Sequence, residues 1–327
     1  MTANTQFQSD AQVEQLLAAA EKQPNATEII GNLADAYWRA GDHARYAALV
    51  RRAFLLKPHS NTIAQLTLEV SGELDQVRER LRALIAHGVA YAPVIAALAI
   101  VEARRGDGAE VRHLMNYERY FRHGMLPPPA GMTTADFNRA LADEIKASLT
   151  FYDTPSKRSI RRGWRHDGLR RTETPALRTF MEQVRQMGMD YIAQLDSHDP
   201  HPFAKSRPSD FAIDGWAVVS GGETHHLPHT HSRAWGTGVY YVVQPEVSRE
   251  PGSHKGWLRV GPPPEAGATA GENWEQRLIE PVPGSFIFMP GYFHHDTEPM
   301  GVDQERICVA FEIQPKELTQ KGDHNDY

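Results

Sequence analysis

The sequence predicts an α+β multidomain protein in which an all-α, repeat-like region precedes an antiparallel β-sandwich or jelly-roll barrel. Apolar side chains in about the first 120 residues recur at the spacing of one helix face. A break of three prolines and a glycine at residues 125–131 then stops helix and imposes a stiff connector. From about residue 210, short alternating strands separated by turns rich in Pro and Gly replace the helices.

This change of pattern predicts two domains. Residues 1–125 would form the helical domain and residues 126–327 the β-domain, with its strand core at about residues 210–315. Two helices are expected to flank the strands, one beginning near Thr134 and one over residues 175–195. A chain of 327 residues is long enough to bury two such cores.

The helical region carries the spacing of a helix–turn–helix repeat of about 34 residues. Small residues, a turn glycine and a closing proline fall at the expected positions, namely Leu33, Ala34, Tyr37, Gly41, Ala53 and Pro58. A second copy is indicated by Leu98, Ala99, Gly106 and Asp107, and a middle unit around residues 71–73 would complete the stack. The pattern resembles the tetratricopeptide repeat; a generic helical bundle is the alternative.

The composition excludes several classes of protein. A formal net charge of -6 argues against a broad nucleic-acid surface, although a basic stretch runs from Lys157 to Arg171. That stretch is either a solvated face or linker, or a surface that attracts an acidic substrate. Cys308 is the only cysteine, which excludes an intrachain disulfide and cysteine-rich zinc sites. With no signal-peptide pattern and no apolar run of about 18 residues, we expect a cytoplasmic protein that does not contact a membrane.

The last strand is the most informative of the five that the pattern predicts. The five are Trp216–Ser220, Gly238–Gln244, Gly256–Val260, Ser285–Met289 and Arg306–Ile313. In the last one, Arg306, Cys308, Ala310 and Glu312 share one face, and apolar residues share the other. The apolar face should pack on the helices around Phe137 and Phe180. The opposite face then lines the barrel, where a buried Arg306 would be costly without an anion to meet it.

Histidines form the candidate metal site. His229 and His231 are two residues apart, so in an extended chain both imidazoles project to one side. A third ligand is expected from His295 or its neighbour His294, and Arg306 follows on the next strand. Neutral imidazole suits iron, copper, zinc and nickel. An isolated His-x-His is usually incidental on a surface; the distal histidine and the arginine in this order favour a metal site.

The order of these motifs resembles the 2-oxoglutarate- and iron(II)-dependent oxygenases of the double-stranded β-helix fold, a cupin-like jelly roll. It is closest to their bacterial branch, in which His-x-His is followed by Ser-Gly-Val-Tyr-Tyr. The first motif is matched by His229-Thr230-His231-Ser232 and Thr237-Gly238-Val239-Tyr240-Tyr241. The second is matched by residues 283–290, Tyr292, His295, Glu298-Pro299 and Arg306. The resemblance covers about residues 134 to 315.

The resemblance implies a role for each of these positions. His229, His231 and His295 would bind iron(II). Arg306 would pair with the distal carboxylate of the co-substrate 2-oxoglutarate, Tyr241 would donate its hydroxyl to the same carboxylate, and Cys308 occupies the position of a family serine that contacts the co-substrate. Dioxygen would be the oxidant and hydroxylation the reaction. A helical repeat ahead of the barrel favours a peptide, protein or amino-acid-like substrate, since stacked helix pairs form concave surfaces.

Several alternatives stay open. His231 stands where the family commonly has a carboxylate ligand, and a three-histidine site also fits oxo-acid-independent, cupin-like dioxygenases or a metal hydrolase. Asp296 is a rival carboxylate ligand, although it should point away from His295 on a strand. Arg306 could instead be a buried partner of Glu312 or Glu298. A non-enzymatic adaptor, with helical repeats that recruit a partner and a structural barrel, is a further alternative.

Overall fold

The computed structural model describes residues 3–58, 73–147, 150–152, 163–222, 225–268 and 270–319. Of the predicted middle repeat unit, Ser71 and Gly72 lie outside these residues, and so do Lys157, Arg158, Arg161 and Arg162 of the basic stretch. None of the described helices combines the length and the apolar character that crossing a bilayer requires.

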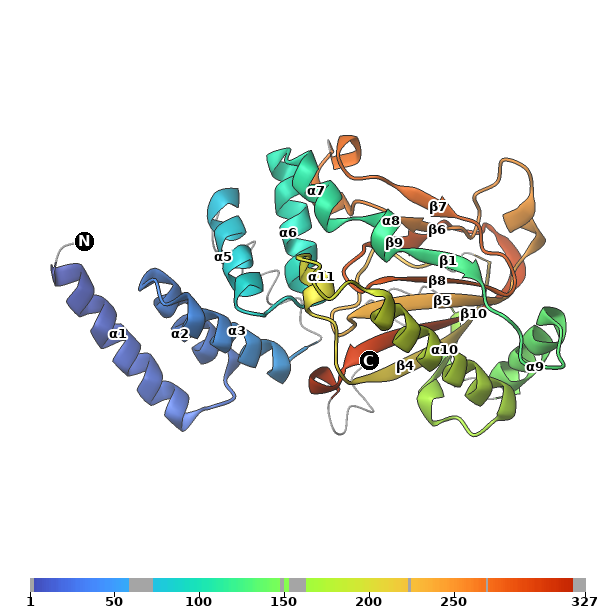
Figure 1. The fold of residues 1–327 in the computed structure, drawn as a ribbon, viewed down its shortest axis with the longest axis horizontal. Coiled ribbons are helices and arrows are strands. Elements are labelled where there is room, and N and C mark those ends of the chain that lie inside the picture. The colour runs from blue at the N-terminus through green and yellow to red at the C-terminus, as the bar shows by residue number, and fades with distance from the viewer. Residues whose placement is uncertain are drawn as a thin grey trace.

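The helical region is drawn out to one side of the sheets, with its first three helices furthest from them and α6 and α7 beside them (Figure 1). Its helices are α1 (Ala3–Lys22), α2 (Thr27–Arg39), α3 (His43–Leu56), α5 (Leu74–Ala86), α6 (Ala92–Arg105), α7 (Gly108–Leu114) and α8 (Tyr117–Tyr120). Helix α6 is buried on every side, as its apolar sequence requires. Its one buried charge, Glu102, is paired with Arg78 of α5 at 2.7 Å.

The two Gly-Asp pairs that suggested a repeat have the same local structure. Gly41 and Gly106 both adopt left-handed backbone, with φ of 77° and 76°, which ends the preceding helix. Asp42 and Asp107 then cap the next helix, each carboxylate accepting a backbone N–H at 3.0 Å. Both positions are therefore helix–turn–helix junctions; a tetratricopeptide array stays a prediction.

All strands of the C-terminal part pair antiparallel in two sheets. The larger sheet has the order β1-β8-β5-β10-β4-β3-β2 and the smaller the order β7-β6-β9. The strands are β1 (Arg122–Met125), β2 (Thr150–Tyr152), β3 (Gly163–Asp167), β4 (Phe211–Gly222), β5 (Gly236–Val243), β6 (Leu258–Val260), β7 (Arg277–Ile279), β8 (Ser285–Pro290), β9 (His295–Thr297) and β10 (Val302–Pro315). The five predicted strands are confirmed, and the short β1, β2, β3, β7 and β9 were not predicted.

The chain alternates between the two sheets, which makes the fold a double-stranded β-helix. From β4 it passes to His229, which bridges to His295 of the smaller sheet, and returns to the larger sheet as β5. It then forms β6 and β7 in the smaller sheet, β8 in the larger, β9 in the smaller and β10 in the larger. The predicted jelly-roll class is therefore confirmed. The alternation also brings β9 and β10, far from His229 in sequence, against the segment that carries it.

Helices α9 (Thr134–Ala147) and α10 (Pro175–Gln194) cover the outer face of the larger sheet (Figure 1). Phe180 contacts Tyr240 and Phe311, with ring centroids 5.1 and 6.4 Å away. Asn138 accepts the Tyr240 hydroxyl at 2.6 Å and donates to the Val242 carbonyl at 3.0 Å. The apolar face of the last strand thus packs on these helices as predicted, and its polar face is left to line the barrel.

Candidate metal centre

Three histidine side chains meet at one point inside the mouth of the barrel. His229 and His295 are directly opposite each other and exchange both backbone hydrogen bonds at 3.1 Å, so their side chains share one face. His231, two residues on, projects to the same face, and its Nε2 lies 3.2 Å from Nε2 of His295. One nitrogen of each ring lies within 4.8 Å of the others. The predicted trio is therefore brought together.

Each of the three rings uses Nδ1 for its hydrogen bond to a carbonyl or carboxylate, so that Nε2 of His231 and Nε2 of His295 face each other. Nδ1 of His229 donates to the Leu227 carbonyl at 2.7 Å, and Nδ1 of His295 donates to the Phe293 carbonyl at 2.9 Å. Nδ1 of His231 donates to Glu312 Oε1 at 2.6 Å. Because each partner can only accept, Nδ1 carries the proton and Nε2 the lone pair. Lone pairs that face each other repel unless a cation lies between them, so the donor set fits a divalent metal ion.

Burial keeps His229 and His295 in the neutral form that binds metal. Burial and the neighbouring His231 lower the pKa of His229 to about 3. Burial also lowers the pKa of His295 well below its ordinary value, and His229 adds to the shift. Neutral imidazole nitrogen is a ligand for iron(II), and three ligands on one side leave positions open for other groups.

The neighbouring candidates for the third ligand point elsewhere. Asp296 accepts two hydrogen bonds from Arg259, at 2.8 and 3.0 Å, as expected for a residue that alternates with His295 along a strand. His294 lies edge-on to Trp274, with ring centroids 6.1 Å apart. A fourth histidine, His226, lies near the trio. Its ring centroid is 5.8 Å from that of His229, and its side chain lines the cavity described next.

A buried cavity of about 50 Å³ runs from the histidines to Arg306. Arg306 is 4% exposed, and its Nε donates to the Gln244 amide oxygen at 3.2 Å. Its guanidinium carbon lies 5.8 Å from the centre of the Tyr241 ring, and the buried Tyr241 hydroxyl has no hydrogen-bond partner in the described part of the chain. A buried cation and an unpartnered hydroxyl that face one cavity fit a carboxylate ligand. The predicted Cys308 lines this cavity too, and burial raises the pKa of its thiol.

The structure does not support the ion pairs that were the alternative for Arg306. Glu298 pairs with Arg259, at 3.2 Å, and Glu312 bonds to His231 and to the Gln314 amide. Within the described ranges, no carboxylate lies within ion-pair distance of Arg306. The guanidinium therefore remains available to a ligand that carries its own negative charge.

Sequence reasoning missed two residues that position the site. Glu312 was considered only as a partner for Arg306, and it instead orients His231. Gln244 fixes the Arg306 guanidinium, although its place at the end of a strand gave no sign of this. The period-two alternation already put Glu312 on the inner face of the last strand, so that signal could have indicated contact with the site.

The three aromatic residues near the motifs divide into two groups. Trp235 stacks on Phe203 with centroids 4.3 Å apart, and the buried Tyr292 donates to the Leu114 carbonyl at 2.6 Å. Both are packing residues. Trp216 lines the cavity instead, with its ring 5.9 Å from that of His231 and the Arg165 guanidinium carbon 4.5 Å from its centre.

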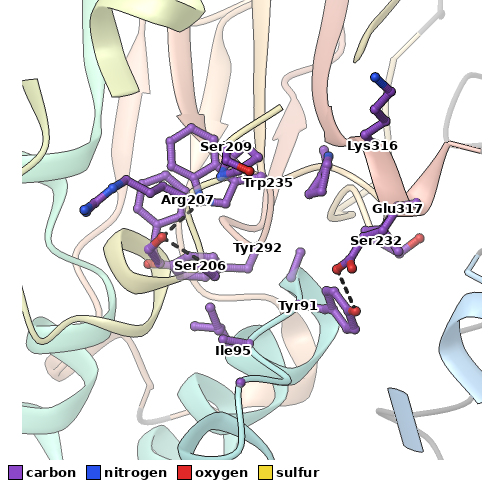
Figure 2. A pocket seen from close by; sticks show the side chains of 18 of the residues that line it. Tyr91, Ile95, Ser206, Arg207, Ser209, Ser232, Trp235, Tyr292, Lys316 and Glu317 are labelled. Carbon is purple, nitrogen blue, oxygen red and sulfur yellow. Dashed lines mark hydrogen bonds between the residues drawn. The ribbon is translucent and has the colours of Figure 1, made fainter. Parts of the chain in front are cut away.

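A second cavity, of about 370 Å³, lies between the helical region and the barrel (Figure 2). Tyr91 and Ile95 of the helical region form one wall, and Ser232, which follows His231 in the chain, lies on another. Tyr91 donates to Glu317 across this seam at 3.0 Å. The volume is within the range of small-ligand pockets, about 300–1,000 Å³.

Comparison with known proteins agrees with this geometry. A family model described as "Putative 2OG-Fe(II) oxygenase" matches residues 214–312, which include the three histidines and Arg306. A search of curated proteins finds no match.

Two of the similar solved structures are prolyl hydroxylases. One, from Pseudomonas putida, is a prolyl-4-hydroxylase with 16% identity and a TM-score of 0.42, over 62% of this chain and 96% of that chain. The other, from Trichoplax adhaerens, is in complex with a peptide fragment of hypoxia inducible factor; it has 13% identity and a TM-score of 0.42, over 66% and 92%. HygX from Streptomyces hygroscopicus, with nickel and 2-oxoglutarate bound, has 10% identity and a TM-score of 0.39, over 63% and 87%. By the family match, residues 214–312 of this chain are similar to the 2-oxoglutarate–iron(II) oxygenases.

Proposed function

We propose that the protein is a 2-oxoglutarate- and dioxygen-dependent non-haem iron(II) oxygenase that hydroxylates its substrate. His229, His231 and His295 hold the iron, Arg306 and Tyr241 hold the distal carboxylate of 2-oxoglutarate, and Cys308 forms part of the wall beside it. One observation carries the proposal. Three imidazoles whose Nδ1 protons are all donated elsewhere converge, and two of them, His231 and His295, line a cavity that also holds an arginine without a carboxylate partner among the described residues.

When bound, iron(II) and 2-oxoglutarate supply a reaction with dioxygen in which the oxo-acid becomes succinate and carbon dioxide and the substrate gains a hydroxyl group. The residues of the chain bind and orient the reactants. The Arg306 fork can pair with a carboxylate through two parallel hydrogen bonds, and Gln244 holds that fork in place. Tyr241 has a hydroxyl proton to donate to the same carboxylate. Arg306 and Tyr241 are buried, and the low dielectric around them strengthens each of these interactions.

We further propose a peptide, protein or amino-acid-like substrate and a division into a helical domain, residues 1–125, and an oxygenase domain, residues 126–327. The second cavity supports the substrate class, because helical residues form one wall of it and the segment just after His231 forms another. Its lining mixes aromatic rings with polar groups, such as Tyr91, whose hydroxyl donates to Glu317, and the ion pair of Asp210 with Lys316. A peptide carries both apolar side chains and polar backbone groups, and it matches such a surface better than a purely apolar ligand does.

The test is reconstitution of the metal-free protein with iron(II) under anaerobic conditions, followed by addition of 2-oxoglutarate and air. Succinate release that depends on both iron and dioxygen, and that is lost in His295→Ala, is the expected result. Oxygen uptake without succinate would favour a three-histidine dioxygenase that needs no oxo-acid. A protein that binds no metal at all would favour the non-enzymatic adaptor. Peptide mixtures incubated with the active enzyme should then contain products heavier by one oxygen atom.

A further inference from the structure

Glu312 is a buried carboxylate joined to a metal-facing histidine. It is 8% exposed on the inner face of β10, and its Oε1 accepts from Nδ1 of His231 at 2.6 Å. Its other oxygen, Oε2, accepts from the Gln314 side-chain amide, also at 2.6 Å. Both oxygens are thus fixed, and the second bond holds the carboxylate in line with the imidazole. A hydrogen bond this short between a carboxylate and an imidazole is of the charge-assisted kind.

The two groups that hydrogen-bond to Glu312 do not neutralise it. His231 is neutral when its Nε2 carries a lone pair, and the Gln314 amide has no charge. Asp214 lies directly opposite Glu312 on β4, and it adds to the negative charge there when ionised. The charge of Arg233, which donates to the Leu318 carbonyl at 2.9 Å, lowers the pKa of Glu312 and is only a part of the compensation. A buried carboxylate needs a counter-charge, and a divalent cation on His231 Nε2 would supply it.

The formal charges of the metal and its ligands also favour a carboxylate next to His231. Iron(II) with two histidines and one carboxylate, the ligand set typical of non-haem oxygenases, has a net charge of plus one. Iron(II) with three neutral histidines has a net charge of plus two. A carboxylate one imidazole away from the metal returns the assembly to plus one. The same carboxylate draws the Nδ1 proton toward itself, which makes the imidazole a stronger donor at Nε2.

We infer that Glu312 is a positioning residue that supplies, through His231, the negative charge that a ligating carboxylate supplies in other oxygenases of this type. The inference rests on the proposed iron site and adds a fourth residue to it. Glu312 acts on the metal through the ring of His231 and touches neither metal nor co-substrate. Its removal should therefore weaken the metal site and change its electronic properties while the fold is kept.

The experiment measures cobalt(II) binding, because cobalt(II) is stable in air and its visible absorption reports on its ligands. Metal-free full-length protein is titrated with cobalt(II) by calorimetry and by absorption spectroscopy. E312Q, which keeps the shape and an acceptor oxygen, should bind cobalt(II) about 10–100-fold more weakly, with a shifted absorption band. E305Q is the matched control, since Glu305 is on the same strand but exposed, paired with Lys146 at 2.7 Å. It should bind as the wild type does.

A double variant tests whether the charge of Glu312, and not its shape, affects metal binding. In H231D, the introduced carboxylate would lie against the Glu312 carboxylate, and the two would repel. We expect H231D to bind cobalt(II) more weakly than the wild type, and H231D/E312Q to bind about tenfold or more tightly than H231D. The same E312Q change would thus lower the cobalt(II) affinity of the wild type and raise that of H231D. If Glu312 only supported the fold, its substitution would lower the cobalt(II) affinity of both proteins.

Each outcome decides the inference. E312Q that binds cobalt(II) as tightly as the wild type, or H231D/E312Q that binds no better than H231D, overturns the role of Glu312 alone. A wild-type protein that binds no cobalt(II) overturns the iron site and this inference together. Thermal unfolding of the metal-free variants checks the fold. Should E312Q not fold, Gln314→Ala decides in its place, because it keeps the carboxylate but frees one oxygen: severalfold weaker binding supports the role, and unchanged binding overturns it.

Discussion

Arg306 and Tyr241 form one corner of the inner cavity, with the guanidinium carbon 5.8 Å from the ring centroid on the inner face of the larger sheet. They come from neighbouring strands, β10 and β5, and Cys308 stands directly opposite Tyr241 in the register. Gln244 fixes Arg306 from the end of β5 at 3.2 Å. The register of β10 against β5 therefore brings Arg306 and Tyr241 together. The two side chains can be substituted separately.

Substitution of Arg306 should weaken co-substrate binding and leave metal binding intact. Arg306→Ala removes a buried cation from its carboxylate partner, a loss of about 3 kcal/mol, or roughly 100-fold in the KM for 2-oxoglutarate. Arg306→Lys should retain part of the affinity, because it keeps the charge but not the fork. The KM is measured by succinate release, and Arg139→Ala, on the exposed side of α9, is the control. Unchanged dependence on 2-oxoglutarate in Arg306→Ala would contradict the assignment.

Tyr241→Phe should have opposite effects on binding and on stability. The hydroxyl is buried without a hydrogen-bond partner in the described residues, so its loss should leave the free energy of unfolding of the free protein unchanged or slightly higher. The same change removes a donor to the co-substrate, which costs about 1 kcal/mol, or roughly fivefold in the KM for 2-oxoglutarate. Urea unfolding measures the free energy of unfolding, and succinate release measures the KM for 2-oxoglutarate. A variant that is destabilised and keeps its KM would show that the hydroxyl is structural.

Gly291→Ala should disturb the metal site through the backbone. A Cβ at Gly291 would lie 2.2 Å from the Ala234 carbonyl oxygen and 3.1 Å from that of His231. The His231 N–H also donates to the Gly291 carbonyl at 2.9 Å, so a shift of one segment moves the other. We expect cobalt(II) affinity to fall about tenfold and the free energy of unfolding to fall by about 1–3 kcal/mol.

The control for Gly291 is Gly271→Ala, because a Cβ at Gly271 has no atom within 4 Å among the described residues. That variant should match the wild type in both measurements. Unaltered cobalt(II) binding in Gly291→Ala would mean that the loop relaxes without moving His231, and the proposed coupling between the two segments would then be wrong.

The sequence predicted which histidines lie together, but it predicted only half of the strands that the structure describes. His229, His231 and Arg306 could be placed because extended chain has a period of two, and five strands could be found because their apolar residues alternate. Strand β9 was missed, since the three residues His-Asp-Thr are too short and too polar to show a pattern. Its position follows only from pairing with β6 and with the His229 segment, which are contacts between distant parts of the chain.

Local sequence could not reveal the partners of the site residues for the same reason. Glu312 is 81 residues from the histidine that it orients, and Gln244 is 62 residues from Arg306. From the sequence alone, Glu312 could have accepted from any inward-facing hydrogen-bond donor, and Gln244 could have bonded to any inward-facing donor or acceptor. Only the register of β10 against β4 and β5 decides which pairs form.

His201 should make the stability of the protein depend on pH below neutrality. It is 1% exposed near the junction of the helical region and the barrel, its Nδ1 accepts the Phe203 N–H at 3.1 Å, and its ring lies 4.6 Å from that of Tyr120. Burial, with His113 nearby, lowers its pKa from 6.5 to about 4, while Asp199 opposes the shift. In the folded protein this imidazole therefore stays neutral down to about pH 4.

The unfolded chain takes up the proton at its ordinary pKa of 6.5, before the folded protein does, so acid favours unfolding. This contribution is fully present above about pH 6.5, is lost progressively as the pH falls toward 4, and changes no further below that value. Between pH 7 and pH 5 it amounts to about 2 kcal/mol. His201→Asn, which keeps an acceptor for the Phe203 N–H but cannot titrate, should lose about 2 kcal/mol less than the wild type over this range in urea unfolding. Because every other histidine is common to both proteins, parallel pH profiles would mean that His201 is protonated as easily in the folded protein as in the unfolded chain.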